Sequence, residues 1–457
     1  MHCPRLFPGA LTLLTATLVT ACATARPEGA PVPSPPLPQG DAAELTAWVE
    51  AVCDAANTRT ACRESALVRV AEERGIAAAM DVVARLGLTD SDGHAASHMI
   101  GIRGYRGVES AAEDFASCTT LHQSGCYHGV VQAYFADLRQ APGPDRMDEE
   151  TVSALCAPYR DLENGYWSLF QCIHGVGHGV MLVHDHHLPR ALETCDLLPT
   201  SWERESCYGG AFMESAVTAL TPHHDHSAVA LAGREPARAE HDDHAHHASH
   251  GAAGGAADPF PAINPDDLHY PCSVLDARYL KACYDMQTAT MLYLLNQDIA
   301  ATAAACREAP DAILRAVCHR SLGRDINAIT GGEHTRSVAL CGQAAPADRP
   351  SCHTGVVKNV IDVTADAASG AAYCERVPAG SEREACYRAI GEQTTVLIPR
   401  LADRARFCLS FDGANRTACM AGARADSSSA TPAPGDPPVA VTGPGGTQTA
   451  ASIPRGR

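Results

Sequence analysis

Short helix-forming runs, separated by polar loops, recur along most of the chain. Residues 299–306 are typical, because this run is rich in alanine and ends at a cysteine. A short polar loop follows, and a second cysteine then opens another helix-like run, as in residues 352–361. Alanine has the highest helix propensity of all residues. The pattern therefore predicts pairs of helices joined by short loops.

Cysteines mark these loops as close couples. When Cys3 and Cys22 are set aside, eighteen of the twenty cysteines remain. In the C-terminal half, the first members of the couples stand at positions 306, 341, 374 and 408, so they recur every 33 to 35 residues. This is the period of helical-hairpin solenoids.

Two pairings of these cysteines are geometrically conceivable, one within each loop and one between neighbouring hairpins. The second would leave Cys53 and Cys419 without partners, so we predict nine short-loop disulfides. Each stabilises the fold by roughly 2–3 kcal/mol in the chain-entropy model. Thiolate metal ligands are the weaker alternative, because the chain has no Cys-x-x-Cys. The predicted pairs are Cys53–Cys62, Cys118–Cys126, Cys156–Cys172, Cys195–Cys207, Cys272–Cys283, Cys306–Cys318, Cys341–Cys352, Cys374–Cys386 and Cys408–Cys419.

The period breaks in two places. The interval between Cys62 and Cys118 has room for one cysteine-free hairpin, with helices near residues 69–86 and 93–105. The interval between Cys207 and Cys272 is too long, and we place the excess in a disordered insert at residues 221–269. We also expect a disordered tail at residues 425–457. The insert is rich in histidine, with His223, His224, His226, His241, His244, His246, His247 and His250.

The fold prediction is an all-α solenoid of about ten antiparallel helical hairpins of roughly 34 residues, each closed by a short-loop disulfide. The helices occupy residues 43–220 and 270–424. Aromatic residues make up only 5% of the chain, which argues against a β-sandwich. The arrangement resembles tetratricopeptide-like α-solenoids, and especially cysteine-rich bacterial repeat proteins with disulfide-locked helix pairs. The Trp-Leu-Gly-Tyr pattern of true tetratricopeptide repeats is absent, and such folds host many functions.

The N-terminus reads as an export signal, with Arg5 followed by an apolar run at residues 11–19. The ending Val19-Thr20-Ala21-Cys22 resembles the lipobox of bacterial lipoproteins. The resemblance implies a signal peptide at residues 1–21, cleavage before Cys22 and lipid attachment to its thiol. Residues 22–42 follow as a Pro-rich linker. We therefore expect an exported chain, lipid-anchored to a bacterial membrane, in the periplasm or on the cell surface; an ordinary secretory signal is the alternative.

Charge and missing motifs narrow the function. The formal net charge of −18 argues against nucleic acid as a partner. No phosphate-binding loop occurs, so we expect no nucleotide. The chain also has no His-Glu-x-x-His, Gly-x-Ser-x-Gly or Cys-x-x-Cys-His motif. The usual zincins, α/β-hydrolases and c-type cytochromes are therefore excluded.

Three consecutive repeats share a histidine at one register position. His128 and His174 each stand two residues after a second cysteine, and His98 takes the same place in the cysteine-free repeat. His94 and His178 lie four residues from a member of this set, which is one helical turn. We expect the five imidazoles to approach one another across a concave groove. Imidazole suits zinc and copper best, with iron and nickel as further candidates.

Other residues complete the picture of the groove. Glu214 is the nearest carboxylate, as a ligand, a partner of a ligand or a general base. Tyr127 and Tyr208 are candidates to line the groove. His319 and His353 follow their cysteines directly, so we expect structural roles for them. The glycines three residues after a second cysteine should allow close helix packing; they are Gly129, Gly175, Gly210, Gly355 and Gly422.

Two functions from different classes follow. The first is transition-metal binding in the histidine-lined groove, as a metal-handling protein or a metalloenzyme, with the histidine-rich insert as a collector. If it is an enzyme, oxidase or hydrolase chemistry is conceivable, and the sequence selects no substrate. The second is a non-catalytic scaffold that binds another envelope protein or a peptide. Confinement of the histidines to three adjacent repeats favours the first.

Overall fold

A computed structural model describes residues 35–54, 59–140, 147–160, 166–220, 260–364 and 366–430. These residues form helices, turns and loops, and no β-strand occurs among them. From Leu37 onward the described helices belong to one compact unit. In this described part of the chain, no helix is both long and apolar enough to cross a membrane.

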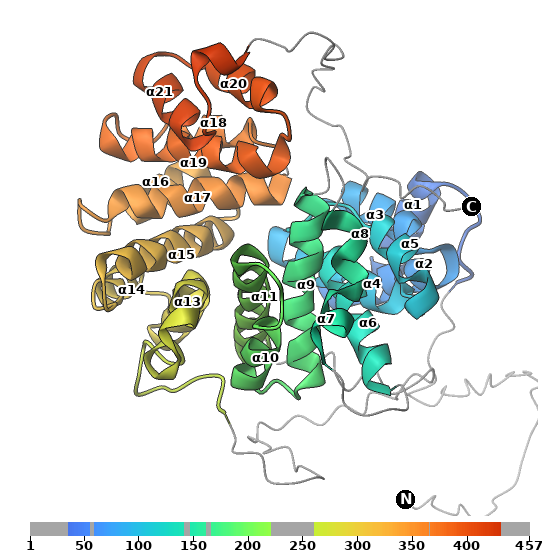
Figure 1. The fold of residues 1–457 in the computed structure, drawn as a ribbon. Helices are drawn as coiled ribbons and strands as arrows, with labels where there is room; N and C mark the ends of the chain where they lie inside the picture. Colours follow the sequence, from blue (N-terminus) through green and yellow to red (C-terminus); the bar gives the residue numbers. More distant parts are fainter. Residues whose placement is uncertain are drawn as a thin grey trace, which may run out of the picture. The chain divides into compact units, whose positions relative to one another are not determined.

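Ten helices, one from each hairpin, form a continuous row in which each packs on the next (Figure 1). The prediction of about ten hairpins in an all-α solenoid is therefore confirmed. The row consists of α2 (Arg59–Arg74), α4 (Asp90–Gly104), α6 (Gly125–Gln140), α9 (Tyr166–Val183), α11 (Ser201–Leu220), α13 (Leu280–Leu294), α15 (Ala312–Thr330), α17 (Arg349–Thr364), α19 (Ser381–Leu397) and α21 (Gly413–Gly422).

In nine of the ten hairpins the other member is made of shorter helices that pack against the row, whereas α13 is preceded among the described residues only by the 3-10 turns η3 (Cys272–Val274) and η4 (Ala277–Tyr279). This second layer comprises α1 (Ala42–Cys53), α3 (Ile76–Leu86), α5 (Ala111–Ala116), α7 (Glu149–Ser153), α8 (Ala157–Arg160), α10 (Leu188–Cys195), α14 (Ile299–Cys306), α16 (His334–Cys341), α18 (Ser369–Cys374) and α20 (Leu401–Leu409). Helices α3 and α4 form the cysteine-free hairpin. Helix α3 begins at Ile76, later than predicted, because Gly75 (φ 90°) ends the preceding helix.

Nine disulfides join the end of a first helix to the start of a second one, with Cα–Cα distances of 5.4 to 5.7 Å. The short-loop pairing is therefore confirmed. An arginine three residues before the second cysteine supports several of the loops. Its guanidinium donates to loop carbonyls, as from Arg315 to Ala309, Arg349 to Ala344 and Arg383 to Val377. The loops are thus closed both covalently and by hydrogen bonds.

Glycines bring neighbouring helices of the row into backbone contact. A Cβ atom on Gly210 would collide with the carbonyl oxygen of His174, and one on Gly177 would collide with that of Cys207. Three further pairs behave in the same way: Gly101 with Gly129, Gly323 with Gly355, and Gly391 with Gly422. The predicted packing role is confirmed for these glycines. A Cβ atom on Gly175 would instead lie 2.9 Å from the side chain of Val131.

The glycine pairs alternate along the row. In each pair, the earlier glycine stands five residues after the cysteine position and the later one stands three residues after it. The pairs therefore join α4 to α6, α9 to α11, α15 to α17 and α19 to α21. In these eight helices the structural unit is therefore two hairpins, about 68 residues, rather than one, whereas α2 and α13 belong to no such pair.

The segments predicted to be unstructured are shorter than expected. Leu37 is buried, and Arg74 donates to the carbonyl oxygens of Pro38 and Gly40 at 2.7 and 3.1 Å, so the end of the linker packs on the array. Phe260 stacks on Tyr270, so the insert ends before residue 269. Residues 425–430 close against α20 as a short 3-10 turn. The predicted signal peptide, Cys22, residues 221–259 and residues 431–457 lie outside the described residues.

Candidate metal centre

The structure brings together all five histidines that the register singled out. They come from α4, α6 and α9, which are consecutive in the row. The ring centroid of His128 lies 4.8 Å from that of His174 and 4.9 Å from that of His178. His98 lies 5.7 Å from His178, and His94 lies 5.9 Å from His128. Side chains that stand two residues after the cysteine position therefore do come together from neighbouring helices.

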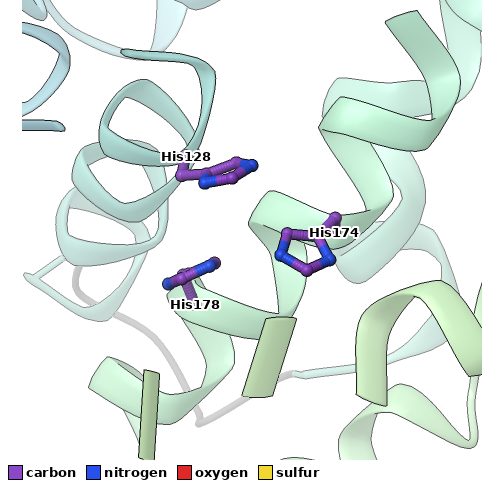
Figure 2. A group of neighbouring side chains, drawn as sticks. All are labelled: His128, His174 and His178. Atoms are coloured by element: carbon purple, nitrogen blue, oxygen red, sulfur yellow. The ribbon is translucent and has the colours of Figure 1, made fainter. Parts of the chain in front are cut away.

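Two groups of three side chains have the geometry to hold a metal ion. The first consists of His128, His174 and His178, and the second of His98, His178 and Glu214; within each group the ligand atoms lie within 4.8 Å of one another. Figure 2 shows the three rings of the first group turned toward a common space, one from α6 and two from α9. His178 belongs to both groups.

The cluster is buried deeper than expected. The exposed fractions are 5% for His98, 3% for His128, 7% for His174 and 2% for His178. Only His128 and His174 reach the lining of the groove, whereas His98 and His178 lie behind them. Of the five rings expected around a concave groove, two therefore line it, because close helix packing places the others inside the array or at its edge.

Glu214 fixes the orientation of His178. The Nδ1 atom of His178 lies 2.7 Å from a carboxylate oxygen of Glu214, and both side chains are buried. Since a carboxylate accepts, Nδ1 carries the proton and Nε2 keeps its lone pair. Gln132 and Thr218 donate to the other carboxylate oxygen at 3.4 and 3.3 Å. A carboxylate that orients a histidine in this way is the usual partner of a metal-binding imidazole.

His128 is held in a comparable way. Its Nε2 atom lies 3.3 Å from the amide oxygen of Gln171, so Nε2 donates and Nδ1 is the unprotonated nitrogen. The Nδ1 atom of His128 and the Nε2 atom of His178 are buried without a hydrogen-bond partner. A buried polar atom without a partner costs about 1–3 kcal/mol. These two nitrogens therefore mark a place where a ligand is needed.

The surroundings keep the central imidazoles neutral. Burial, reinforced by His178 and His94, lowers the pKa of His174 to about 3. Burial and the four neighbouring histidines hold the pKa of His128 well below its ordinary value. A neutral imidazole is the form that binds metal, because protonation occupies the lone pair.

A groove of about 380 Å³ opens from the cluster along the inner row of helices. At the histidine end it is lined by Trp167, Phe170 and Trp202, and the ring of Phe170 lies 5.8 Å from His174. At the other end it is lined by charged residues, among them Arg320 and Asp362. A volume of this size suits a small molecule or a short stretch of peptide.

His94 lies at the edge of the cluster. Its Nδ1 atom donates to the carbonyl oxygen of His122 at 2.9 Å. His122 begins a run of three residues in the left-handed region, with φ values of 49°, 54° and 62° for His122, Gln123 and Ser124. Non-glycine residues rarely adopt this conformation, and such strain gathers at functional sites. The strained turn forms part of the groove wall through Gln123 and Ser124.

Other predicted residues lie elsewhere. Tyr127 donates its hydroxyl to the carbonyl of Cys118, and Tyr208 donates to Asp196, so neither lines the groove; the residue after the cysteine faces the second layer of helices. For the same reason His319 and His353 are buried structural residues, as expected. His184 bonds to Thr194 at 2.7 Å, away from the cluster.

Sequence reasoning missed Gln132, Gln171 and the aromatic wall. Gln132 stands six residues after its cysteine, the same position that His178 occupies in the next repeat. Extending the register by one helical turn would have found it. Gln171 and Trp167 precede His174 by three and seven residues, on the same face of α9.

The chain was compared with protein-family models, curated proteins and solved structures. No protein-family model matches it, and neither a curated protein nor a solved structure matches it. The buried histidine cluster that can hold a metal ion therefore carries the functional argument by itself.

Proposed function

We propose that the chain is an exported, lipid-anchored helical-repeat protein that binds a transition-metal ion through His128, His174 and His178. Zinc and copper are the preferred ions, because imidazole suits both. The nine disulfides are typical of an oxidising, extracytoplasmic compartment. The histidine-rich insert serves as a collector of ions for the buried site.

One observation carries this proposal. Two buried ring nitrogens, on His128 and His178, have no hydrogen-bond partner, and a third histidine lies beside them. A scaffold that only bound a peptide would gain nothing from this arrangement. The cost of leaving the nitrogens unsatisfied is removed when an ion binds.

The groove suggests how the ion is used. Three imidazoles leave a fourth position on a tetrahedral ion, and such an open position is characteristic of catalytic and transfer sites. Because His128 and His174 line the groove, that position is accessible to a small molecule. Glu214 and Gln171 would hold the rings of His178 and His128 in place, and the aromatic residues would form the wall of the groove. The geometry is compatible with a metalloenzyme and with a metal-handling protein.

The test uses the full chain with the eight insert histidines replaced by asparagine, so that only the folded part can bind metal. We expect His174→Ala to weaken zinc or copper binding at least ten-fold. His184→Ala is the matched control, because this histidine bonds to Thr194 outside the cluster. Competition with a chromophoric chelator measures the affinity. Equal affinities in the parent and in His174→Ala would reject the site in favour of the scaffold function.

A further inference from the structure

We propose that the cluster is a dinuclear centre in which His178 bridges two transition-metal ions. This inference rests on the proposed metal-binding function and extends it from one ion to two. It starts from the shared membership of His178 in both groups of potential ligands. No other side chain belongs to both.

The two groups draw their remaining ligands from different helices. The first draws its other ligands, His128 and His174, from α6 and α9. The second draws His98 from α4 and Glu214 from α11. A single four-coordinate ion in the first group leaves His98 and Glu214 outside its coordination sphere. Two ions use every member.

The two nitrogens of His178 differ in their surroundings. Nε2 is buried without a hydrogen-bond partner, whereas Nδ1 lies 2.7 Å from Glu214. The first ion binds Nε2 together with His128 and His174. The second takes the place of the proton between Nδ1 and Glu214 and completes its sphere with His98. That proton leaves to solvent, and the ring becomes an imidazolate that coordinates through both nitrogens.

The charge of the site supports this order of loading. The first group contains only neutral imidazoles, whereas the second contains the carboxylate of Glu214. Adding the second ion converts His178 to an anion, so a carboxylate and an imidazolate then face the two cations. A nearby cation favours the deprotonated form of a ligand, and this effect offsets the cost of removing the proton.

Metal stoichiometry separates the possible outcomes. The full chain with its insert histidines replaced by asparagine is loaded with Cu²⁺, desalted and analysed by mass spectrometry. We expect two ions in this parent chain and one in His98→Ala or in His174→Ala. His178→Ala should retain neither, because it removes a ligand from both groups. His184→Ala is the control and should retain two.

The magnetic signature tests the bridge itself. Two Cu²⁺ ions joined by an imidazolate couple, so the fully loaded parent should lose most of its electron paramagnetic resonance intensity. His98→Ala with one ion should show the full intensity of isolated copper. Two ions with undiminished intensity would reject the bridge. One ion in the parent, unchanged by His98→Ala, would reject the dinuclear centre and leave the proposed function intact. No retained ion would reject both.

Discussion

The two halves of the array share a scaffold and differ in the polar groups they carry on it. Both α4–α11 and α13–α21 have short-loop disulfides and glycine pairs at the same register positions. Two residues after the cysteine, the first half carries His98, His128 and His174. The second half carries Asp285 and Arg320 there. The scaffold therefore fixes where a side chain points and leaves its chemistry open.

The charged groups along the groove in the second half form ion pairs with one another. Arg320 pairs with Asp285 at 3.0 Å, and Lys358 pairs with Glu392 at 2.6 Å. Burial alone would raise the pKa of Asp285, but Arg320 and Arg324 hold it below its ordinary value. In the first half, by contrast, two buried nitrogens have no partner. The groove therefore carries ion pairs at one end and neutral imidazoles, which are potential metal ligands, at the other.

Alanine substitutions at two adjacent glycines, Gly209 and Gly210, test the close helix packing that both halves share. Gly210→Ala would force a Cβ atom against the carbonyl oxygen of His174, so we expect a loss of about 3 kcal/mol or more. Gly209→Ala is the control, because its Cβ atom would lie 3.5 Å from the His174 ring, in ordinary contact. Alanine should even add up to about 1 kcal/mol of helix propensity there. Denaturant unfolding measures both. Equal effects would show that the helices do not cross at these glycines.

The first half should make the metal-free protein sensitive to acid. Burial lowers the pKa of both His128 and His174, so the unfolded chain binds more protons than the native one below the ordinary histidine pKa of 6.5. Stability is complete above this pH and is lost as the pH falls toward 3. Between pH 6.5 and 5.5 the two histidines together cost about 2 kcal/mol. Unfolding of the parent and of His174→Gln across this range checks the slope, which should be smaller in the variant.

Breaking an ion pair in the second half should lower the free energy of unfolding by less than acid does in the first half. Arg320→Met leaves Asp285 without its main partner, and the two side chains are 30% and 43% exposed, so solvent screens the loss to about 1 kcal/mol. The corresponding change in the first half, His174→Gln, should leave the metal-free protein at neutral pH within about 0.5 kcal/mol of the parent. Thermal unfolding without metal compares the two. A greater loss from His174→Gln would mean that the cluster is structural.

Asp362, in the groove wall of the second half, should give a pH dependence of the opposite sign to that of the histidines. Burial raises the pKa of Asp362 to about 7, and Lys358 only partly opposes this. The native state therefore holds its proton more tightly than the unfolded chain, and stability is lost as the pH rises from about 4 through 7. Asp362→Asn should raise stability at pH 8 by roughly 2–4 kcal/mol and have little effect at pH 4. A destabilising effect at pH 8 would indicate that the charged carboxylate is needed.

Much of the fold follows from cysteine and glycine spacing, because covalent closure and close helix contact impose strict periods. The prediction failed where local sequence had no period. Leu37 lies in a Pro-rich stretch, yet it is buried once α1 to α3 provide a surface. The alternation of the glycine pairs was also missed, since the earlier member stands at a different distance from its cysteine, as Gly177 does.

The register was enough to select the histidines, because equivalent helix positions in a solenoid point the same way. It was not enough to give their depth. His178 is covered only because α11 brings Glu214 across it, and Gln132 reaches the same carboxylate from α6. These contacts join residues 36 and 82 positions apart. A pattern confined to single repeats cannot contain them.

The histidine cluster lies at the boundary between two of the two-hairpin units. One unit ends at α6 and the next begins at α9, and no glycine pair joins these two helices; Gly175 and Gly179 instead meet the side chains of Val131 and Phe135. His128 belongs to the first unit and His174 to the second. An ion bound between them would therefore link two neighbouring units of the array as well as three histidines.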